Sequence, residues 1–304
     1  MQVSTNQFFN SANASLSRLT EQADKLQTQI STTKRLQAPS DDVVAYRQLQ
    51  LISRANADDA AYASSITMAK ALLDQGDTTL GSITTQIQRA QELAVKANNG
   101  VLSDSDRKAI ASELKGVIET LTQLANTQDA RGNALFAGAQ GGEPVTVNPD
   151  GTITVNDTGQ PAAIPIGSNQ SIVPTETAAD VFGGIPTASG GTTDLFAVLT
   201  DFAAALDAGG SQTAAASTAG DALKAALDNV TNSRASVGAR GARLTLISNA
   251  MTDAGTARET QRSALEDTNV TTAITELQKT MTILQATQAS FTKLSSLSLF
   301  DYLK

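Results

Sequence analysis

Side chains that could act as catalytic bases, nucleophiles or metal ligands are scarce in this chain. Its 304 residues include no His and no Cys, so imidazole bases, thiolate nucleophiles and all zinc ligands other than carboxylates are missing. Ser31 and Lys34 have the S-x-x-K spacing of a serine nucleophile and its lysine, but the S-D-N and K-T-G strings that accompany it in penicillin-binding enzymes are absent. A Ser-His-Asp triad and a zinc hydrolase are therefore excluded. We expect no enzymatic activity, no catalytic or metal site and no cofactor.

Two further patterns involve residues that can handle protons or phosphates. Neighbouring aspartates stand at 41–42 and at 58–59. Adjacent residues on a helix point to different faces, so these pairs predict helix caps or solvated charge rather than an acid/base pair. Gly238 and Gly241 form a G-x-x-G string inside a heptad pattern, which predicts close helix packing rather than a phosphate-binding loop.

Charge and apolar content limit the class of partner. The chain has 22 Lys and Arg against 30 Asp and Glu, a net charge of −8, which is the wrong sign for binding a phosphate backbone. No apolar run approaches the roughly 20 residues needed to cross a bilayer. The first fifteen residues lack the basic and apolar regions of a Sec signal peptide. We expect no nucleic-acid or membrane partner, and either a cytosolic location or export by another route.

Proline placement separates a helical frame from a middle segment. Six of the seven prolines lie between Pro144 and Pro186, so the long stretches on either side are free to be helical. The middle also lacks any basic residue between Arg131 and Lys224, although it carries nine acidic ones. We expect an N-terminal assembly helix at 1–39, the first half of a helical trunk at 40–139, a small insert rich in strands and loops at 140–192, the second half of the trunk at 193–267, and a C-terminal assembly helix at 268–304.

Apolar residues in the frame are spaced alternately three and four apart, which is the a/d pattern of a coiled coil. The predicted fold class is mainly α: an elongated antiparallel helical bundle or coiled coil of N- and C-terminal helices with a small β-rich inserted domain. The predicted seam positions are Phe9, Ala12, Leu16, Leu19, Ala23, Leu26 and Ile30 near the N-terminus; Ile66, Ala69, Leu73, Gly76, Leu80, Ile83, Ile87, Ala90, Ala94 and Ala97 in the trunk; and Val270, Ile274, Leu277, Met281, Leu284, Gln288 and Phe291 near the C-terminus.

Capping and turn residues suggest where the elements begin and end. Ser4 with Gln7 predicts a capping box for the first helix, which should end near Pro39, and a second helix should begin at Ser40 or Asp41. Ser103 and Asp106 predict another capping box, after a turn at 98–100. This box should start a third helix, whose heptad pattern continues through Gln128 and Arg131 to Leu135. The string at 145–155 predicts a β-hairpin around Asn-Pro-Asp-Gly, and 195–206 predicts a short helix.

The two end segments need a partner for their apolar seams. Their flanking positions are often Ser, Thr, Gln or Asn, so isolated helices would be marginal. Residues 5–36 and 268–300 could pair with each other and with copies from neighbouring subunits, which predicts polymerisation through the ends. A monomeric bundle in which all the helices close one core satisfies the same pattern, and heptads alone do not separate the two.

Six strings of this sequence, in their order and spacing, carry a resemblance to known proteins. The strings are VSTNQFF, QISTTKRLQAPSDDVVAYRQL, RAQELAVKANNGVLSDSDRKAIASEL, LANTQDARGNALFAGAQ, NSRASVGARGARL and QASFTKLSSLSLFDYLK. Together they resemble the bacterial flagellar hook-filament junction proteins, also called hook-associated protein 3, which are relatives of flagellin. The likeness covers both ends and the frame, outside roughly 140–190. Val43 departs from the proline that the family often has after the S-D-D triplet.

The resemblance implies a secreted structural subunit at the hook-filament junction of the flagellum. Its implied partners are other copies of itself in a ring, the first hook-associated protein and flagellin. It also implies unfolded passage through the flagellar type III export apparatus, with a chaperone on the C-terminal helix. Carried over by position, the implied assembly residues are Phe9, Leu16, Leu19, Leu26, Ile30, Ile274, Leu277, Met281, Leu284, Phe291, Leu294 and Leu297.

Two alternatives remain open at this point. Flagellin shares the heptads and the VGAR-type segment, although RGNALFAGA and the ending LSSLSLFDYLK favour the junction protein. A flagellin-like adhesin would use the insert to bind glycans. The insert has few aromatic side chains for stacking on sugars, and Phe182 is the only one from 140 to 190.

Overall fold

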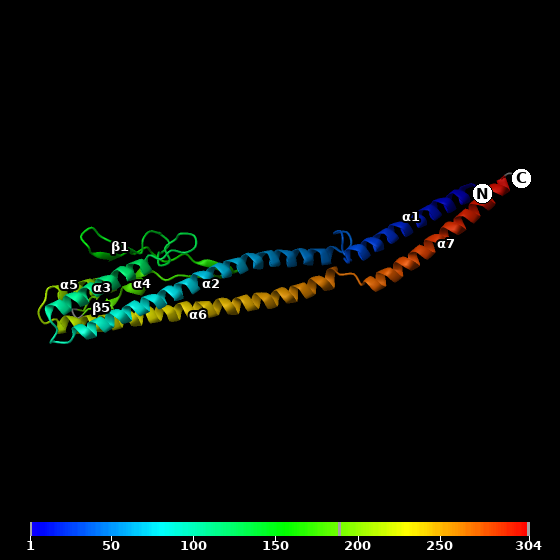
Figure 1. The fold of residues 1–304 in the computed structure, drawn as a ribbon. Helices are drawn as coiled ribbons and strands as arrows, with labels where there is room; N and C mark the ends of the chain where they lie inside the picture. Colours follow the sequence, from blue (N-terminus) through cyan, green and yellow to red (C-terminus); the bar gives the residue numbers. More distant parts are fainter. Residues whose placement is uncertain (1, 188–189, 303–304) are drawn as a thin grey trace. The chain divides into compact units, whose positions relative to one another are not determined.

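The computed structural model describes residues 2–187 and 190–302, with the side chains of residue 7, residues 9–187 and residues 190–293. The chain divides into two compact units. Met1–Ala57 and Thr252–Lys304 form the first, here called the end unit, and Asp58–Met251 form the second, here called the trunk unit. Helices dominate both, and the strands form small antiparallel pairs (Figure 1). The mainly helical class with a small strand-containing insert is thereby confirmed.

The elements follow in the order expected of two helical halves around an insert. The helices are α1 (Gln2–Thr32), α2 (Val43–Ala97), α3 (Asp104–Ala125), α4 (Ala178–Phe182), α5 (Leu195–Asp207), α6 (Thr213–Glu266) and α7 (Val270–Tyr302). The strands are β1 (Val145–Val147), β2 (Ile153–Val155), β3 (Ile164–Gly167), β4 (Gln170–Ile172), β5 (Ile185–Pro186) and β6 (Thr192–Thr193).

The trunk unit has one apolar core, to which α2, α3, α5 and α6 contribute. All ten predicted seam positions from Ile66 to Ala97 are buried. α3 begins at the predicted capping box, in which the Ser103 hydroxyl accepts the Asp106 N–H and the Asp106 carboxylate accepts the Ser103 N–H. Leu80 of α2, Leu114 of α3 and Leu223 of α6 are fully buried in the same core, so these three helices meet there.

The predicted extension of α3 to residue 135 is wrong. The helix ends at Ala125 because the Asn126 side chain pairs with Val145: its Nδ2 donates to the Val145 carbonyl at 2.7 Å, and its Oδ1 accepts the Val145 N–H at 3.1 Å. Asp129 then accepts the N–H groups of Arg131 and Asn133, which fixes a turn. Pairing of the Asn126 side chain with the backbone of β1 therefore ends the helix where the heptad would continue it.

The predicted hairpin at 145–155 is confirmed, with Val145 opposite Val155 in the β1–β2 pair. The insert shares the core of the helices rather than forming one of its own. Phe182 is fully buried, and its ring centroid lies 6.2 Å from that of Phe136 and 5.2 Å from that of Phe196 in α5. α5 also confirms the short helix expected at 195–206.

The prediction of close packing at Gly238 and Gly241 is wrong. Both lie inside α6, but a Cβ added at either position would meet no heavy atom within 4 Å. The two glycines therefore make no close helix approach in this chain. Being helical, they do not form a phosphate-binding loop either.

Candidate functional site

In the end unit, α1 and α7 run side by side (Figure 1). Every predicted seam position on α1 from Phe9 to Ile30 is buried or half-buried. Near the free ends of the helices, the rings of Phe9 and Phe291 meet edge to face at 5.3 Å between centroids. The predicted pairing of the two ends with each other within one chain is therefore observed.

On α7, the predicted seam is partly wrong: the row of residues that the helix buries lies around the helix axis from part of the predicted row. The most buried positions include two small or polar side chains, Ala273 and Thr280, which are 5% and 3% exposed. Each lies four residues before a seam leucine: Ala273 before Leu277 and Thr280 before Leu284. The prediction instead placed in the seam the residues three before these leucines, Ile274 and Met281. The seam follows Ala273, Leu277, Thr280, Leu284, Thr287 and Phe291, all buried or half-buried.

Larger apolar side chains lie outside the seam, on a stripe of α7 that the chain leaves uncovered. Val270, Ile274 and Met281 are 36%, 41% and 42% exposed, and Gln288 at the end of the same row is also exposed. We call Val270, Ile274 and Met281 the outer stripe. The seam thus takes small or polar side chains at positions 273 and 280, and the outer stripe stays exposed in the single chain. Leu294 and Leu297 lie outside the residues whose side chains the structure describes.

A short backbone pairing ties the end of α1 to the start of α7. Thr33 has a positive φ of 57°, a strained conformation for a β-branched residue, and turns the chain out of α1. Lys34 and Asp267 then form an antiparallel bridge. In it the Arg35 N–H donates to the Glu266 carbonyl at 2.6 Å, and the Thr268 N–H donates to the Thr33 carbonyl at 2.9 Å. We call residues 33–35 and 266–268 the end link.

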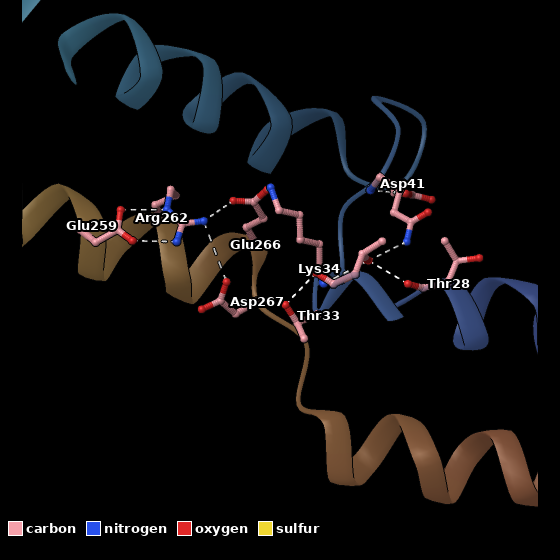
Figure 2. A network of polar contacts seen from close by, with 10 residues as sticks. Thr28, Thr33, Lys34, Asp41, Glu259, Arg262, Glu266 and Asp267 are labelled. Carbon is pink, nitrogen blue, oxygen red and sulfur yellow. Dashed lines mark hydrogen bonds and ion pairs between the residues drawn. The ribbon is translucent and has the colours of Figure 1, made fainter. Parts of the chain in front are cut away.

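Ion pairs reinforce the end link (Figure 2). Lys34 Nζ lies 2.5 Å from Glu266 Oε1, and Arg262 contacts both Glu259, at 2.7 Å, and Glu266. The hydrogen bond from Lys34 holds the pKa of Glu266 below its usual value, and Arg262 does the same to the pKa of Glu259. Ser31 and Lys34 do not contact each other as a nucleophile and base would, since Ser31 donates to the Thr28 carbonyl.

Asp41 and Asp42 hold the connection between α1 and α2. Asp41 Oδ1 lies 2.6 Å from Lys25 Nζ, and its Oδ2 accepts the N–H groups of Gln37 and Ala38. The hydrogen bond from Lys25, followed by those two amides, lowers the pKa of Asp41 to about 2. Asp42 Oδ1 accepts the N–H groups at 44 and 45, so it caps α2. Asp42 is a helix cap, as predicted, whereas Asp41 holds the loop before the helix instead.

Three predicted boundaries in the end unit are wrong. α1 begins at Gln2, so Ser4 lies within the helix instead of capping it. The helix ends at Thr32, before Pro39, because Thr33 adopts its left-handed conformation to enter the end link. α2 begins at Val43 rather than at Ser40 or Asp41, because Asp41 caps the preceding loop and leaves Asp42 to cap the helix.

Acid is expected to weaken the connection at 33–42. The folded-state pKa of Asp41 is about 2, against an ordinary 3.8, so its stabilising effect is complete above pH 3.8 and is lost as the pH falls through about 2. Asp41→Asn should therefore lower the urea midpoint at pH 6 and make little difference at pH 2. Asp201→Asn, which removes an exposed carboxylate of α5, serves as the control. Equal midpoints for Asp41→Asn and the native chain at pH 6 would contradict this role.

The described part of the chain offers no assembled metal or membrane site. Among those residues, no three or more His, Cys, Asp or Glu side chains gather where they could hold a metal ion. Within the same ranges, none of the helices combines the length and apolar content needed to cross a bilayer. The outer stripe of α7 is the candidate functional surface because its large apolar side chains are exposed in the single chain.

Family models match the two helical ends of the chain. Residues 3–141 match the N-terminal helical region of bacterial flagellin, and residues 221–303 match its C-terminal helical region. α1 and α7 lie within these matches, and the insert lies between them.

Curated relatives identify the family within the flagellin-like proteins, and a solved structure shares the fold. The flagellar hook-associated protein 3 of Salmonella typhimurium is 30% identical over 99% of both chains, and that of Escherichia coli is 32% identical over 91% of both. A flagellin of Listeria monocytogenes is 26% identical over 97% of this chain and 95% of its own. A flagellar hook-associated protein from Vibrio parahaemolyticus has a similar fold, with a TM-score of 0.68 and 20% identity over 75% of this chain and 100% of that one. This chain belongs to the flagellar hook-associated protein 3 family.

Proposed function

We propose that this chain is a structural subunit of the bacterial flagellum, an adapter that forms a ring where the hook meets the flagellin filament. The observation that carries the proposal is the outer stripe of α7, whose large apolar side chains have no cover in a single chain. Fully burying such a side chain is worth about 1.5–3 kcal/mol. A ring of copies packed through α1 and α7 would provide that burial.

The proposed partners are copies of the chain within the ring, the first hook-associated protein on the hook side, and flagellin on the filament side. The proposed assembly residues with described side chains are Phe9, Leu16, Leu19, Leu26, Ile30, Ile274, Leu277, Met281, Leu284 and Phe291. On α1 these positions already face the intrachain seam. On α7, Ile274 and Met281 are the ones left for a neighbouring copy.

The proposed route to this location is unfolded export through the flagellar type III channel, with a chaperone on the C-terminal helix. A chain without Cys needs no disulfide formation after export, which supports this route. The exposed apolar side chains of the outer stripe would favour aggregation before assembly, and a chaperone bound to the C-terminal helix would cover them. The final location proposed is the extracellular hook-filament junction.

Relatives favour the adapter over the two alternatives. Identity to the hook-associated proteins 3 is 30% and 32%, compared with 26% to the flagellin. A glycan-binding insert has less support because Phe182, its only aromatic side chain from 140 to 190, is fully buried among other rings. We further propose that the chain has a mechanical role and no enzymatic one.

Loss of this chain from its bacterium should leave hooks that carry no filament and should release unassembled flagellin into the medium. An adapter is needed to hold the first flagellins, whereas loss of a flagellin leaves no such pool of shed subunits. The measurement is electron microscopy of hooks together with an immunoblot for flagellin in the culture medium, and re-expression of the native chain is the control. Normal filaments on cells without the chain would refute the proposed function.

A further inference from the structure

We propose that a second contact joins copies of this chain: the first turns of α2 in one copy dock into a groove between α5 and α6 of another. This contact is separate from the outer stripe of α7. It rests on the proposed function only in requiring that copies assemble with one another.

The groove lies on the trunk unit and has a volume of about 660 Å³. Val198 and Phe202 of α5 line it together with alanines of α6, including Ala222. Asp201 and Asp221, both exposed, also line it, one from each helix. The groove therefore offers an apolar surface between two carboxylates, which suits a ligand with apolar side chains flanked by cations.

The first turns of α2 carry such a pattern. Val44 and Leu51 are 69% and 59% exposed, far more than the apolar side chains of the trunk core. Arg47 and Arg54, also exposed, alternate with them at the spacing 44, 47, 51, 54, which places the four side chains on one face of the helix. This face, here called the α2 face, thus presents two apolar side chains and two cations.

Charge favours the α2 face over the outer stripe of α7 as the occupant of the groove. The described residues provide no ion-pair or hydrogen-bond partner for Arg47, Arg54, Asp201 or Asp221. The outer stripe of α7 carries no cation at its own positions, so it would leave the groove carboxylates uncompensated. Opposite charges around an apolar contact steer association and fix its register.

A contact between two different surfaces of identical chains is heterologous. Each copy offers one α2 face and one groove, so every copy can bind a neighbour on each side. Such contacts close into rings or continue as filaments, depending on the rotation that relates the copies. The proposed contact is therefore compatible with a ring, and it would add to whatever affinity the end helices supply.

Cysteine cross-linking can test the docking directly, because the native chain has no Cys. A tagged copy carrying Leu51→Cys is mixed with an untagged copy carrying Ala222→Cys and oxidised at a concentration that supports assembly. We expect the mixed disulfide to form at least ten times faster than with Val147→Cys, an exposed valine of β1, in place of Leu51→Cys. Equal rates would overturn the proposal.

Charge reversal supplies an independent readout of the same contact. Adding Arg47→Asp and Arg54→Asp to the first copy should slow the cross-link about tenfold, and adding Asp201→Arg and Asp221→Arg to the second should restore it. No slowing, or no restoration, would contradict the proposed pairing of charges.

The reactivity of a single cysteine separates this inference from the proposed function. If the α7 stripe meets any surface of a neighbouring copy, Met281→Cys should react with a maleimide at least ten times more slowly in the assembly than in the dilute chain. If it does so while residues 51 and 222 do not cross-link, the groove contact is wrong and assembly through the ends stands. If residues 51 and 222 cross-link while Met281→Cys stays equally reactive, assembly through the α7 stripe is refuted and the groove contact stands.

Discussion

Replacing Ile274 and Met281 together by aspartate is expected to abolish incorporation of this chain into the flagellum while leaving the single chain folded. Both side chains are about two-fifths exposed and lie outside the seam that α7 buries. The single chain therefore loses little packing. In the assembly, the change would remove on the order of 1 kcal/mol of apolar burial per side chain and place two charges in an apolar contact.

The measurement is complementation of a strain that lacks the chain, scored by filaments per hook, together with circular dichroism of the purified variant. Thr275→Asp with Thr282→Asp is the matched control, because it puts two charges at the same spacing on a neighbouring, exposed row of α7. We expect the control to support filaments. Normal filaments with the Ile274 and Met281 variant would show that the outer stripe is not an assembly surface.

Phe182→Ala is expected to lower the free energy of unfolding of the trunk unit by about 3–5 kcal/mol. Phe182 is fully buried, and its ring lies against those of Phe136 and Phe196. Removing it would leave a cavity where the insert joins α5. Such a loss is a large share of the stability of a typical domain.

Urea unfolding followed by circular dichroism measures this effect. Val147→Ala is the control, since Val147 belongs to the insert but is 58% exposed, and we expect it to change the unfolding free energy by less than about 0.5 kcal/mol. A similarly small change for Phe182→Ala would mean that the insert does not share the core of the helices.

The trunk helices could be predicted because their heptads are long and their caps are local. The row from Ile66 to Ala97 keeps its spacing without a break, and Ser103 with Asp106 forms the expected capping box. The end of α3 could not be predicted, because it depends on Asn126 meeting Val145, a contact between a helix end and a strand that only the folded insert creates.

The seam of α7 was predicted in the wrong rotation because the largest apolar residues are not those that face α1. Ile274 and Met281 fit a heptad as well as Ala273 and Thr280 do, and hydrophobicity favours the larger pair. In a chain that also binds neighbouring copies, as proposed here, the larger apolar side chains can lie on the face that binds the neighbour rather than on the face that packs within the chain. The prediction fails because the a/d pattern assigns one apolar face to each helix, whereas α7 has two: the seam against α1 and the outer stripe.

The end link was missed because its partners are far apart in the sequence. Lys34 and Glu266 carry opposite charges, but nothing local to either indicates that the two would meet. The residue type of Thr33 does not indicate the turn either, because β-branched residues rarely adopt a left-handed conformation. Opposite charges at the two ends of the frame are the only feature that could have suggested the pairing.

Amide hydrogen exchange tests the central claim most directly, because it compares the end helices with the trunk core in one experiment. In the dilute single chain, we predict that amides of α7 between 270 and 293 exchange at least about 100-fold faster than those of α2 between 66 and 97. We predict that they become protected when copies assemble. If α1 and α7 are already as protected as α2 in the dilute chain, and assembly adds nothing, their apolar surfaces need no neighbouring copy and the account is contradicted.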